Sequence, residues 1–328
     1  MRTASNPIWV LTGLVGKAAL AGLVVAGSLL LAYFPWDQDA ALSAAEIQKT
    51  REYYAQAYKA PPVDELSTPD SERYVTIATA AAKKFKVEEK VRTFVEQFSL
   101  ADKHVLDVGS GRGNLQDMVK DYTGLDISSA VGRFYHKPLV IGSATAMPFE
   151  DNSFDAVWTV WVLEHIPAPE QALREIRRVV KPGGHIFLMP AWGVTPYVAN
   201  GYGVRAYSDL SVGGKLMKAS IGPRTYSWAL AQLLIRPVRN EMSKMSPGPT
   251  TFHYRRLQPN YETYWEADSD AVNSLDRFET ALWFTSRGDS WLNQGEDELF
   301  EFKGPLILQV EKPDSSQASG KRPSEMAR

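Results

Sequence analysis

A glycine-rich turn after a short apolar stretch is the first feature of this sequence that could do chemistry. Residues 105–108 are apolar apart from Asp107, and residues 109–113 read Gly-Ser-Gly-Arg-Gly before a helical pattern begins. Glycines at a strand-to-helix turn let the backbone approach a ligand closely. We therefore interpret this turn as a ligand-binding loop that has the carboxyl group of Asp107 beside it.

A second acid, Asp126, follows 19 residues after Asp107, at the end of the next expected strand. An acid at that position can accept hydrogen bonds from both hydroxyl groups of a ribose; the alternative is a helix cap. The glycines are spaced G-x-G-x-G, whereas a dinucleotide fingerprint is spaced G-x-G-x-x-G, and Asn114 stands in place of its last glycine. This spacing disfavours a nicotinamide oxidoreductase.

Three further motifs follow in order. Residues 142–155 read Gly-Ser-Ala-Thr-Ala-Met-Pro-Phe-Glu-Asp-Asn-Ser-Phe-Asp, residues 162–166 read Val-Leu-Glu-His-Ile, and residues 173–184 read Leu-Arg-Glu-Ile-Arg-Arg-Val-Val-Lys-Pro-Gly-Gly. Together with the glycine turn they resemble the class I S-adenosylmethionine-dependent methyltransferases. The resemblance is to the small-molecule branch (type 11 methyltransferase domain) that includes enzymes of ubiquinone and menaquinone biosynthesis.

The resemblance implies S-adenosylmethionine as the cofactor and assigns residues to it. The glycine turn would hold its methionine end, and Asp126 would hold its ribose, with Ile127 beside the adenine. Where the family usually has Gly-Asp-Ala, this chain has Ser143, which can hydrogen-bond but brings no charge. The expected cofactor-binding residues are Asp107, Gly109, Ser110, Gly111, Gly113, Asp126, Ile127, Ser143, Ala144, Thr159 and Val160.

Catalytic residues are harder to assign, because methyl transfer from a sulfonium needs alignment and a dry pocket more than acid–base groups. A general base helps only where the acceptor is a poor nucleophile such as a hydroxyl group. Glu164 and His165 are candidates, although the pair could equally tie loops together, and His253 is a weaker candidate. The chain has no cysteine, which excludes thiolate metal sites and cysteine nucleophiles, and we expect no metal.

Residues 8–34 form an apolar run whose one charge is Lys17. Residues 18–34 alone would reach about 26 Å as a helix, and the whole run would span a bilayer if Lys17 snorkels. We interpret residues 1–36 as a membrane anchor, with a cleaved signal peptide or a core helix as alternatives. The numbers of basic residues before and after this run are nearly equal, so the positive-inside rule does not decide its orientation in the membrane. Since the cofactor is cytosolic, we expect a cytosol-facing domain.

The chain as a whole is 44% hydrophobic and 23% charged, as in globular proteins. Short apolar runs alternate with helical patterns over residues 99–190, which favours a parallel α/β sheet. With the resemblance, we expect a Rossmann-like, seven-stranded, mostly parallel sheet with helices on both faces. The remaining segments are a linker with N-terminal helices (37–98), a long substrate-capping insert (191–273), final strands (274–312, with candidates at 281–284 and 306–311) and a disordered tail (313–328).

The insert is strongly basic. Residues 191–260 include nine basic residues and only two acidic ones. Residues 226–235 predict an apolar helix that ends at Arg236-Pro237. Such a helix flanked by basic residues suits either a lid on the core or a membrane surface with anionic lipid. Tyrosines that could line the acceptor pocket are Tyr197, Tyr202, Tyr207, Tyr226 and Tyr254.

We therefore expect methyl transfer to a small-molecule or lipid-linked acceptor near a membrane. The alternative from a different class is a non-catalytic cofactor-binding or membrane scaffold protein that kept the fold. A nucleic-acid methyltransferase would carry an Asn/Asp-Pro-Pro-Tyr/Phe motif after the fourth strand, and residues 161–164 read Trp-Val-Leu-Glu instead. The net charge of −2 likewise gives no reason to expect nucleic-acid binding.

Overall fold

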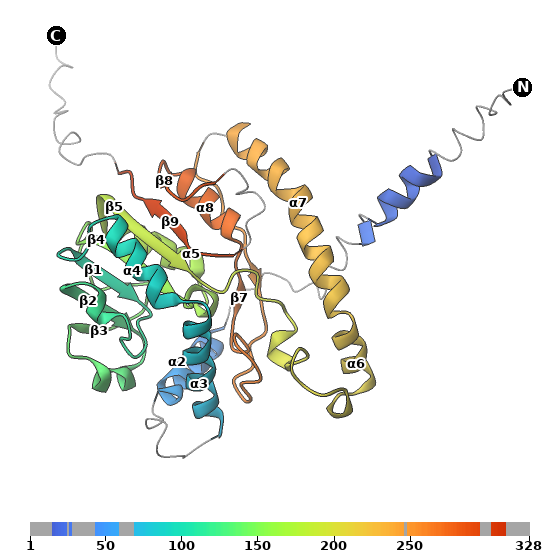
Figure 1. Ribbon diagram of the computed structural model, residues 1–328, viewed down its shortest axis with the longest axis horizontal. Coiled ribbons are helices and arrows are strands. Elements are labelled where there is room, and N and C mark those ends of the chain that lie inside the picture. Colours follow the sequence, from blue (N-terminus) through green and yellow to red (C-terminus); the bar gives the residue numbers. More distant parts are fainter. Residues whose placement is uncertain are drawn as a thin grey trace, which may run out of the picture.

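A seven-stranded sheet forms the centre of the molecule (Figure 1). The computed structural model describes residues 15–24, 26–27, 43–58, 69–245, 248–295 and 303–312. The strand order is β3-β2-β1-β4-β5-β9-β8; β1 to β5 run parallel, and β9 is antiparallel to both β5 and β8. This confirms the predicted mostly parallel, Rossmann-like sheet. The strands are β1 (His104–Val108), β2 (Asp121–Asp126), β3 (Leu139–Ile141), β4 (Phe154–Val160), β5 (Val180–Met189), β8 (Ser290–Trp291) and β9 (Leu306–Gln309).

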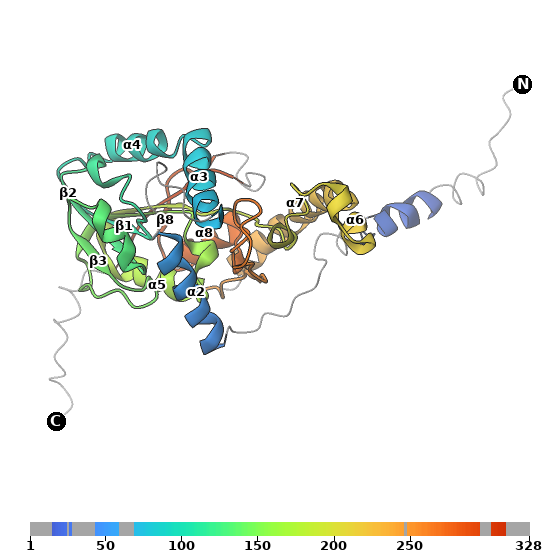
Figure 2. The same ribbon diagram turned by 90° about the horizontal axis from the view of Figure 1, so that it is seen from below.

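Helices cover both faces of the sheet (Figure 2). On one face α4 (Val87–Gln97) buries Val91 and Phe94 against alternate residues of the strands, such as Trp158. On the other face α5 (Pro169–Val179) packs on the residues between them, together with α8 (Arg277–Thr285). Pro169 occupies the first turn of α5, where its missing N–H costs no hydrogen bond. Because parallel strands share one carboxyl edge, the motifs that follow β1, β2 and β4 gather there.

Two N-terminal helices precede the sheet in the chain. These are α2 (Ala44–Ala57) and α3 (Pro69–Lys84), and they contact each other through ring contacts such as Tyr54–Tyr74, with centroids 6.4 Å apart. The residue after α2, Tyr58, accepts a hydrogen bond from Arg133 at its carbonyl oxygen. Arg133 belongs to the 3-10 segment that follows β2, η2 (Ser129–Phe134). The N-terminal helices are therefore tied to the carboxyl edge of the sheet.

The predicted strand at residues 281–284 is wrong, because this run lies inside α8. Asp276 caps the helix by accepting a hydrogen bond from the backbone N–H of Glu279. The run is buried on all sides, between α5 and the last strands. A short apolar run that is buried all round does not reveal whether it is helix or strand. The other candidate, residues 306–311, contains β9.

The insert contains α6 (Val212–Ala219), α7 (Ile221–Met245) and a two-stranded ribbon of β6 (Arg255–Arg256) and β7 (Asn273–Ser274). The predicted end of its apolar helix at Arg236-Pro237 is wrong, because α7 continues through Pro237. Arg236 donates to Asp276 at 2.6 Å, and Arg239 makes two hydrogen bonds to Glu279 of α8. These contacts hold both sides of the proline, which offsets its missing hydrogen bond.

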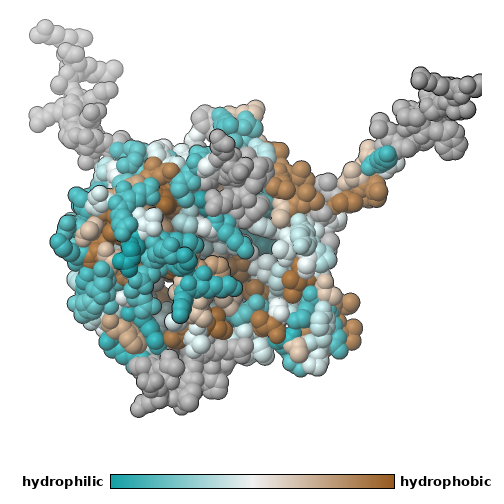
Figure 3. Space-filling view, viewed as in Figure 1, coloured by the Kyte–Doolittle hydropathy of each residue, from teal (hydrophilic) through white to brown (hydrophobic). Residues whose placement is uncertain are grey.

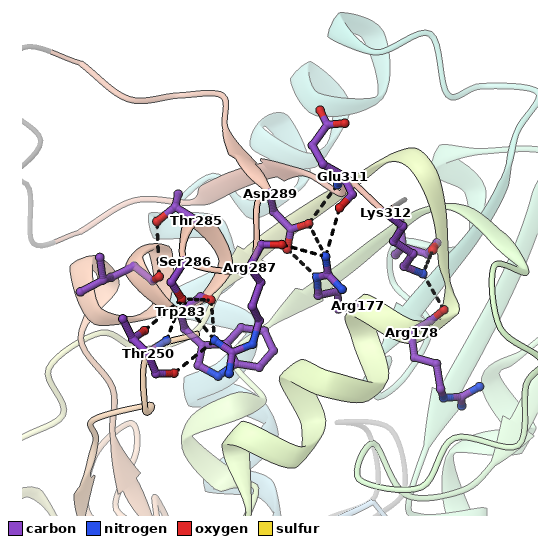
Figure 4. A network of polar contacts seen from close by, with 12 residues as sticks. Arg177, Arg178, Thr250, Trp283, Thr285, Ser286, Arg287, Asp289, Glu311 and Lys312 are labelled. Carbon is purple, nitrogen blue, oxygen red and sulfur yellow. Dashed lines mark hydrogen bonds and ion pairs between the residues drawn. The ribbon is translucent and has the colours of Figure 1, made fainter. Parts of the chain in front are cut away.

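A buried polar network joins α5 to the last strands (Figure 4). Arg177 of α5 donates two hydrogen bonds to Asp289, at 2.7 and 3.0 Å, and a third to the carbonyl oxygen of Glu311. The side chain of Asp289 is fully buried. Nearby, the guanidinium of Arg287 stacks 3.8 Å over the ring of Trp283. The network fixes the chain after α8 and after β9 against α5.

The predicted N-terminal anchor falls largely on residues that the structure does not describe. Residues 15–24 are helical and exposed. Among the helices of the described ranges, none is long and apolar enough to cross a membrane. The anchor within residues 8–34 therefore stays a prediction, and the expected disorder of residues 313–328 lies outside the described residues.

Candidate functional site

The glycine turn folds back on the end of β2. The backbone N–H groups of Gly109 and Ser110 both donate to the carbonyl oxygen of Leu125, at 2.8 and 3.1 Å. Gly109 has a φ of +71°, and a Cβ atom there would overlap the methyl groups of Val162. Gly111 also has a positive φ, of +52°. The turn therefore requires glycine for its conformation and, at Gly109, for space.

Asp126 is bound to this turn directly. Its Oδ2 accepts from the backbone N–H of Gly111 at 2.8 Å, and its Oδ1 accepts from that of Ser128 at 2.8 Å. Burial raises the pKa of Asp126, and the backbone hydrogen bonds oppose that shift. Each carboxylate oxygen keeps a further lone pair, and Asp126 lines the pocket described next. Asp126 is thus a structural clamp on the turn that can still accept hydrogen bonds from a ligand.

A pocket with about 1000 Å³ of empty space opens beside the turn. The predicted residues Gly109, Asp126, Ile127, Ser143 and Ala144 line it together, as the resemblance implied. The hydroxyl group of Ser143 lies 2.8 Å from that of the residue two positions on and accepts its backbone N–H. Ser143 therefore shapes this wall by local hydrogen bonds and brings no charge to it.

A second cavity adjoins the first across the turn. Ser110, Gly111 and Val160 line it, and Gly109 and Trp161 line both cavities. Two other predicted residues contribute differently. Thr159 is buried within β4, and Gly113 packs against Tyr135.

Asp107 lies at the end of β1, where it is buried and accepts a hydrogen bond from the hydroxyl group of Tyr122 at 2.9 Å. Burial raises the pKa of Asp107 to about 7, against the opposing effect of the polar groups of Trp158 and Tyr122. No basic side chain is among the causes of this shift. A cationic ligand group at the turn would favour the carboxylate form.

Three tyrosines from the N-terminal helices cover the pocket. Tyr54, Tyr58 and Tyr74 line it, and the rings of Tyr58 and Tyr74 meet edge to face at 5.9 Å. The hydroxyl oxygen of Tyr58 would lie 3.3 Å from a Cβ placed on Gly111, so its ring sits directly on the turn. Burial and the nearby charge of Asp126 raise the pKa of Tyr58, which keeps its hydroxyl group protonated. The sequence interpretation missed these residues, although the i, i+4 spacing of Tyr54 and Tyr58 was a signal.

Comparisons with known proteins find methyltransferases. A family described as "Methyltransferase domain" matches residues 106–188. The demethylmenaquinone methyltransferase of Renibacterium salmoninarum is 30% identical over 169 residues, which are 47% of this chain and 69% of that protein. A sterol 24-C-methyltransferase of Gibberella zeae is 41% identical over 112 residues, 29% of each protein. A solved structure, the amino pentose methyltransferase of Micromonospora echinaspora with bound S-adenosylmethionine, is 19% identical, with 39% of this chain and 59% of that chain covered at a TM-score of 0.32.

The chain belongs to the S-adenosylmethionine-dependent methyltransferases. Its cofactor is therefore S-adenosylmethionine, and the pocket of this methyltransferase fits that molecule. Asp126 lines this pocket and stays the predicted acceptor of hydrogen bonds from the ribose. Asp107 lines neither of the two cavities described above, and its contact with the methionine end of the cofactor stays a prediction.

The methyltransferase places a buried acid–base cluster at one end of the pocket. His165, which lines the pocket, has its Nδ1 3.5 Å from Asp270 Oδ2 and its Nε2 3.9 Å from Glu164 Oε1. The hydroxyl group of Tyr54 donates to the same Oδ2 at 2.7 Å. Burial lowers the pKa of His165, but the charges of Asp270 and Glu164 outweigh burial, and the net shift is upward. The cluster thus joins α2, the segment after β4 and the insert.

Glu164 differs in role from its neighbour. Its side chain is fully buried, and its Oε1 accepts from the backbone N–H of Ala191 at 2.9 Å. Its backbone oxygen accepts from Val272 at 2.9 Å. Ligand atoms of Glu164, His165 and Asp268 lie within 4.8 Å of one another, and burial raises the pKa of both acids. These three side chains could ligate a metal ion, so the expectation of no metal stays a prediction.

The third catalytic candidate, His253, lies elsewhere. It lines a cleft between α7 and the body of the methyltransferase, together with Tyr197 and Tyr254. Tyr226 is largely exposed on α7. None of these residues lines the cofactor pocket, which the N-terminal helices cover instead. The residues that cover the pocket thus come from the segment 37–98 and not from the insert. The capping of the acceptor site by the insert stays a prediction.

Proposed function

We propose that this methyltransferase methylates a small, largely apolar acceptor such as a quinone-like or lipid-linked ring, near a membrane. The observation that carries the proposal is the position of His165: it lines the pocket, and its Nδ1 lies 3.5 Å from Asp270, which also accepts a hydrogen bond from Tyr54 of α2. An acceptor that enters this pocket therefore meets both the cofactor loop and a proton acceptor.

The residues of the chain have three tasks in this reaction. Bound S-adenosylmethionine supplies the electrophilic methyl group. The glycine turn and Asp126 fix the position of the cofactor, since alignment contributes much of the rate of such a displacement. The buried rings of Tyr54, Tyr58 and Tyr74 exclude water, and aromatic faces attract a sulfonium cation. His165 removes a proton if the acceptor atom is a hydroxyl oxygen.

The class of acceptor rests on two kinds of support. The relatives are named for demethylmenaquinone and a sterol, which are apolar ring systems. The apolar run of residues 8–34 would hold the chain at a membrane, where such acceptors concentrate. We propose a cytosol-facing domain, because S-adenosylmethionine is made there.

The test has two stages. Calorimetric titration of S-adenosylmethionine into the detergent-solubilised full chain should give micromolar binding. Methyl-labelled cofactor is then supplied with a polyprenyl hydroquinone and, separately, with its non-hydroxylated analogue. Label on an oxygen of the hydroquinone, with none in the analogue, would support O-methylation with His165 as the base. Cofactor binding without label in any apolar acceptor would refute the acceptor class, and no cofactor binding by the folded chain would favour a scaffold protein instead.

A further inference from the structure

The helix α7 is amphipathic in the opposite sense to a helix on a water-exposed surface. Its buried polar side chains are those of Arg224, Ser227, Gln232 and Arg236. From Tyr226 to Val238 its outward side chains are apolar and 36–79% exposed: Tyr226, Leu230, Leu233, Leu234 and Val238. Beyond them the exposed Met242 stands beside an exposed acid, Glu241. A helix packed on a soluble body normally buries its apolar stripe and exposes its polar one. The outer face of α7 therefore suits an apolar environment.

Contacts on the inner face fix this orientation. Arg236 donates to Asp276 at 2.6 Å, and Arg239 makes hydrogen bonds of 3.0 and 3.2 Å to Glu279. Near the start of α7 the guanidinium of Arg224 lies 4.9 Å over the ring of Tyr197. These contacts lie along the helix, so α7 cannot rotate its leucines inward without breaking buried ion pairs, which is strongly unfavourable.

The outer face is also uncharged over a long distance. Residues 222–238 are all described, and none of the exposed ones carries a charge. Seventeen helical residues correspond to about 25 Å. Exposed lysines occur beyond this strip, at Lys215 in α6 and at Lys244 in the last turn of α7. Figure 3 shows apolar surface gathered over α7.

This pattern fits a lipid surface better than a second copy of the chain. A strip about 25 Å long and one helix wide, roughly 10 Å, is far smaller than the roughly 800 Å² that each partner contributes to a stable interface. An apolar strip with Lys215 beyond one end and the exposed Lys244–Glu241 ion pair beyond the other matches the boundary between acyl chains and charged headgroups. The described N-terminal helix, residues 15–24, also exposes Val15, Leu20, Leu23 and Val24. The helix of residues 15–24 and the outer face of α7 thus both present exposed apolar side chains that favour an apolar environment.

We propose that the outer face of α7 lies in the surface of an anionic bilayer and holds the methyltransferase domain against it. This inference rests on the membrane location in the proposed function and adds the element that makes the contact. Because the cofactor pocket and the outer face of α7 share no residue, each can be tested without the other.

The absence of cysteine allows a single label at any chosen position. The full chain is reconstituted into vesicles of phosphatidylcholine and phosphatidylglycerol after labelling of Leu234→Cys or Val238→Cys with an environment-sensitive dye. The control is Glu96→Cys on the exposed side of α4, which lies apart from α7 in Figures 1 and 2. We expect quenchers in the acyl chains to act on the α7 labels and not on the control. A second substitution, Leu233→Glu, should return the Val238→Cys label to control values.

Equal quenching of α7 and control labels by aqueous iodide would overturn the proposal. Protection of the α7 labels from iodide without quenching by the acyl-chain quenchers would also overturn it, since a second copy or another segment of the chain, rather than lipid, would then cover the helix. All labelled variants should bind S-adenosylmethionine as the parent chain does. Loss of cofactor binding in the parent would refute the proposed function and leave the quenching result valid.

Discussion

Replacement of Asp126 by alanine should affect stability and cofactor binding together. In the protein its two oxygens each accept a backbone N–H at 2.8 Å, from Gly111 and Ser128. Hydrogen bonds to a charged group contribute about 1.5–3 kcal/mol each, but the raised pKa of Asp126 shows that burial of the charge offsets part of this. Because the net shift of this pKa is upward, the loss on substitution comes from the two backbone N–H groups left without a partner, at about 1–3 kcal/mol each. We therefore expect the free energy of unfolding to fall by about 2–4 kcal/mol, and the melting temperature by roughly 4–16 °C.

The same substitution should also weaken cofactor binding, and by more than the loss of stability alone would cause. Loss of the hydrogen bonds from a ribose to a buried carboxylate corresponds to about 10- to 100-fold weaker binding. Differential scanning calorimetry and calorimetric titration measure the two effects separately. The control is Asp121→Ala, which removes an exposed acid at the other end of β2 and should change neither. A folded Asp126→Ala variant with parental affinity would refute the assignment of Asp126 to the ribose.

Three further predictions concern the turn, the acid–base pair and the core. Gly109→Ala should abolish cofactor binding and destabilise the fold, whereas Gly183→Ala, at a φ of +75° with no atom within 4 Å of its Cβ, should cost only about 1–2 kcal/mol in thermal unfolding. Asp270→Asn removes a negative charge that raises the pKa of His165, so the acidic limb of the rate–pH profile should move to lower pH; an unmoved limb would exclude His165 as the base. Arg177→Ala should lower the free energy of unfolding by about 3–5 kcal/mol, because its bidentate carboxylate partner is fully buried; denaturant unfolding measures this.

The sheet and the cofactor loop were predictable because their signals are local. The alternation of residues 99–190 and the glycine turn determine short-range geometry, and the structure places Gly109, Asp126 and Ser143 around one pocket as expected. The wrong assignments arose where burial hides periodicity. Residues 281–284 are apolar on all sides, and Pro237 is held inside α7 by contacts with α8 that no local pattern contains.

The cover of the pocket was missed for a different reason. Tyr54 meets Asp270 across 216 positions of sequence, and the same Asp270 faces His165. No spacing rule connects such residues, because only the packing of α2 and the insert against the sheet brings them together. The arrangement has a mechanistic consequence. Since one carboxylate serves both Tyr54 of the cover and His165 of the pocket wall, displacement of α2 would also alter the charge around His165. In the proposed reaction, the position of α2 and the proton affinity of His165 would therefore be coupled through Asp270.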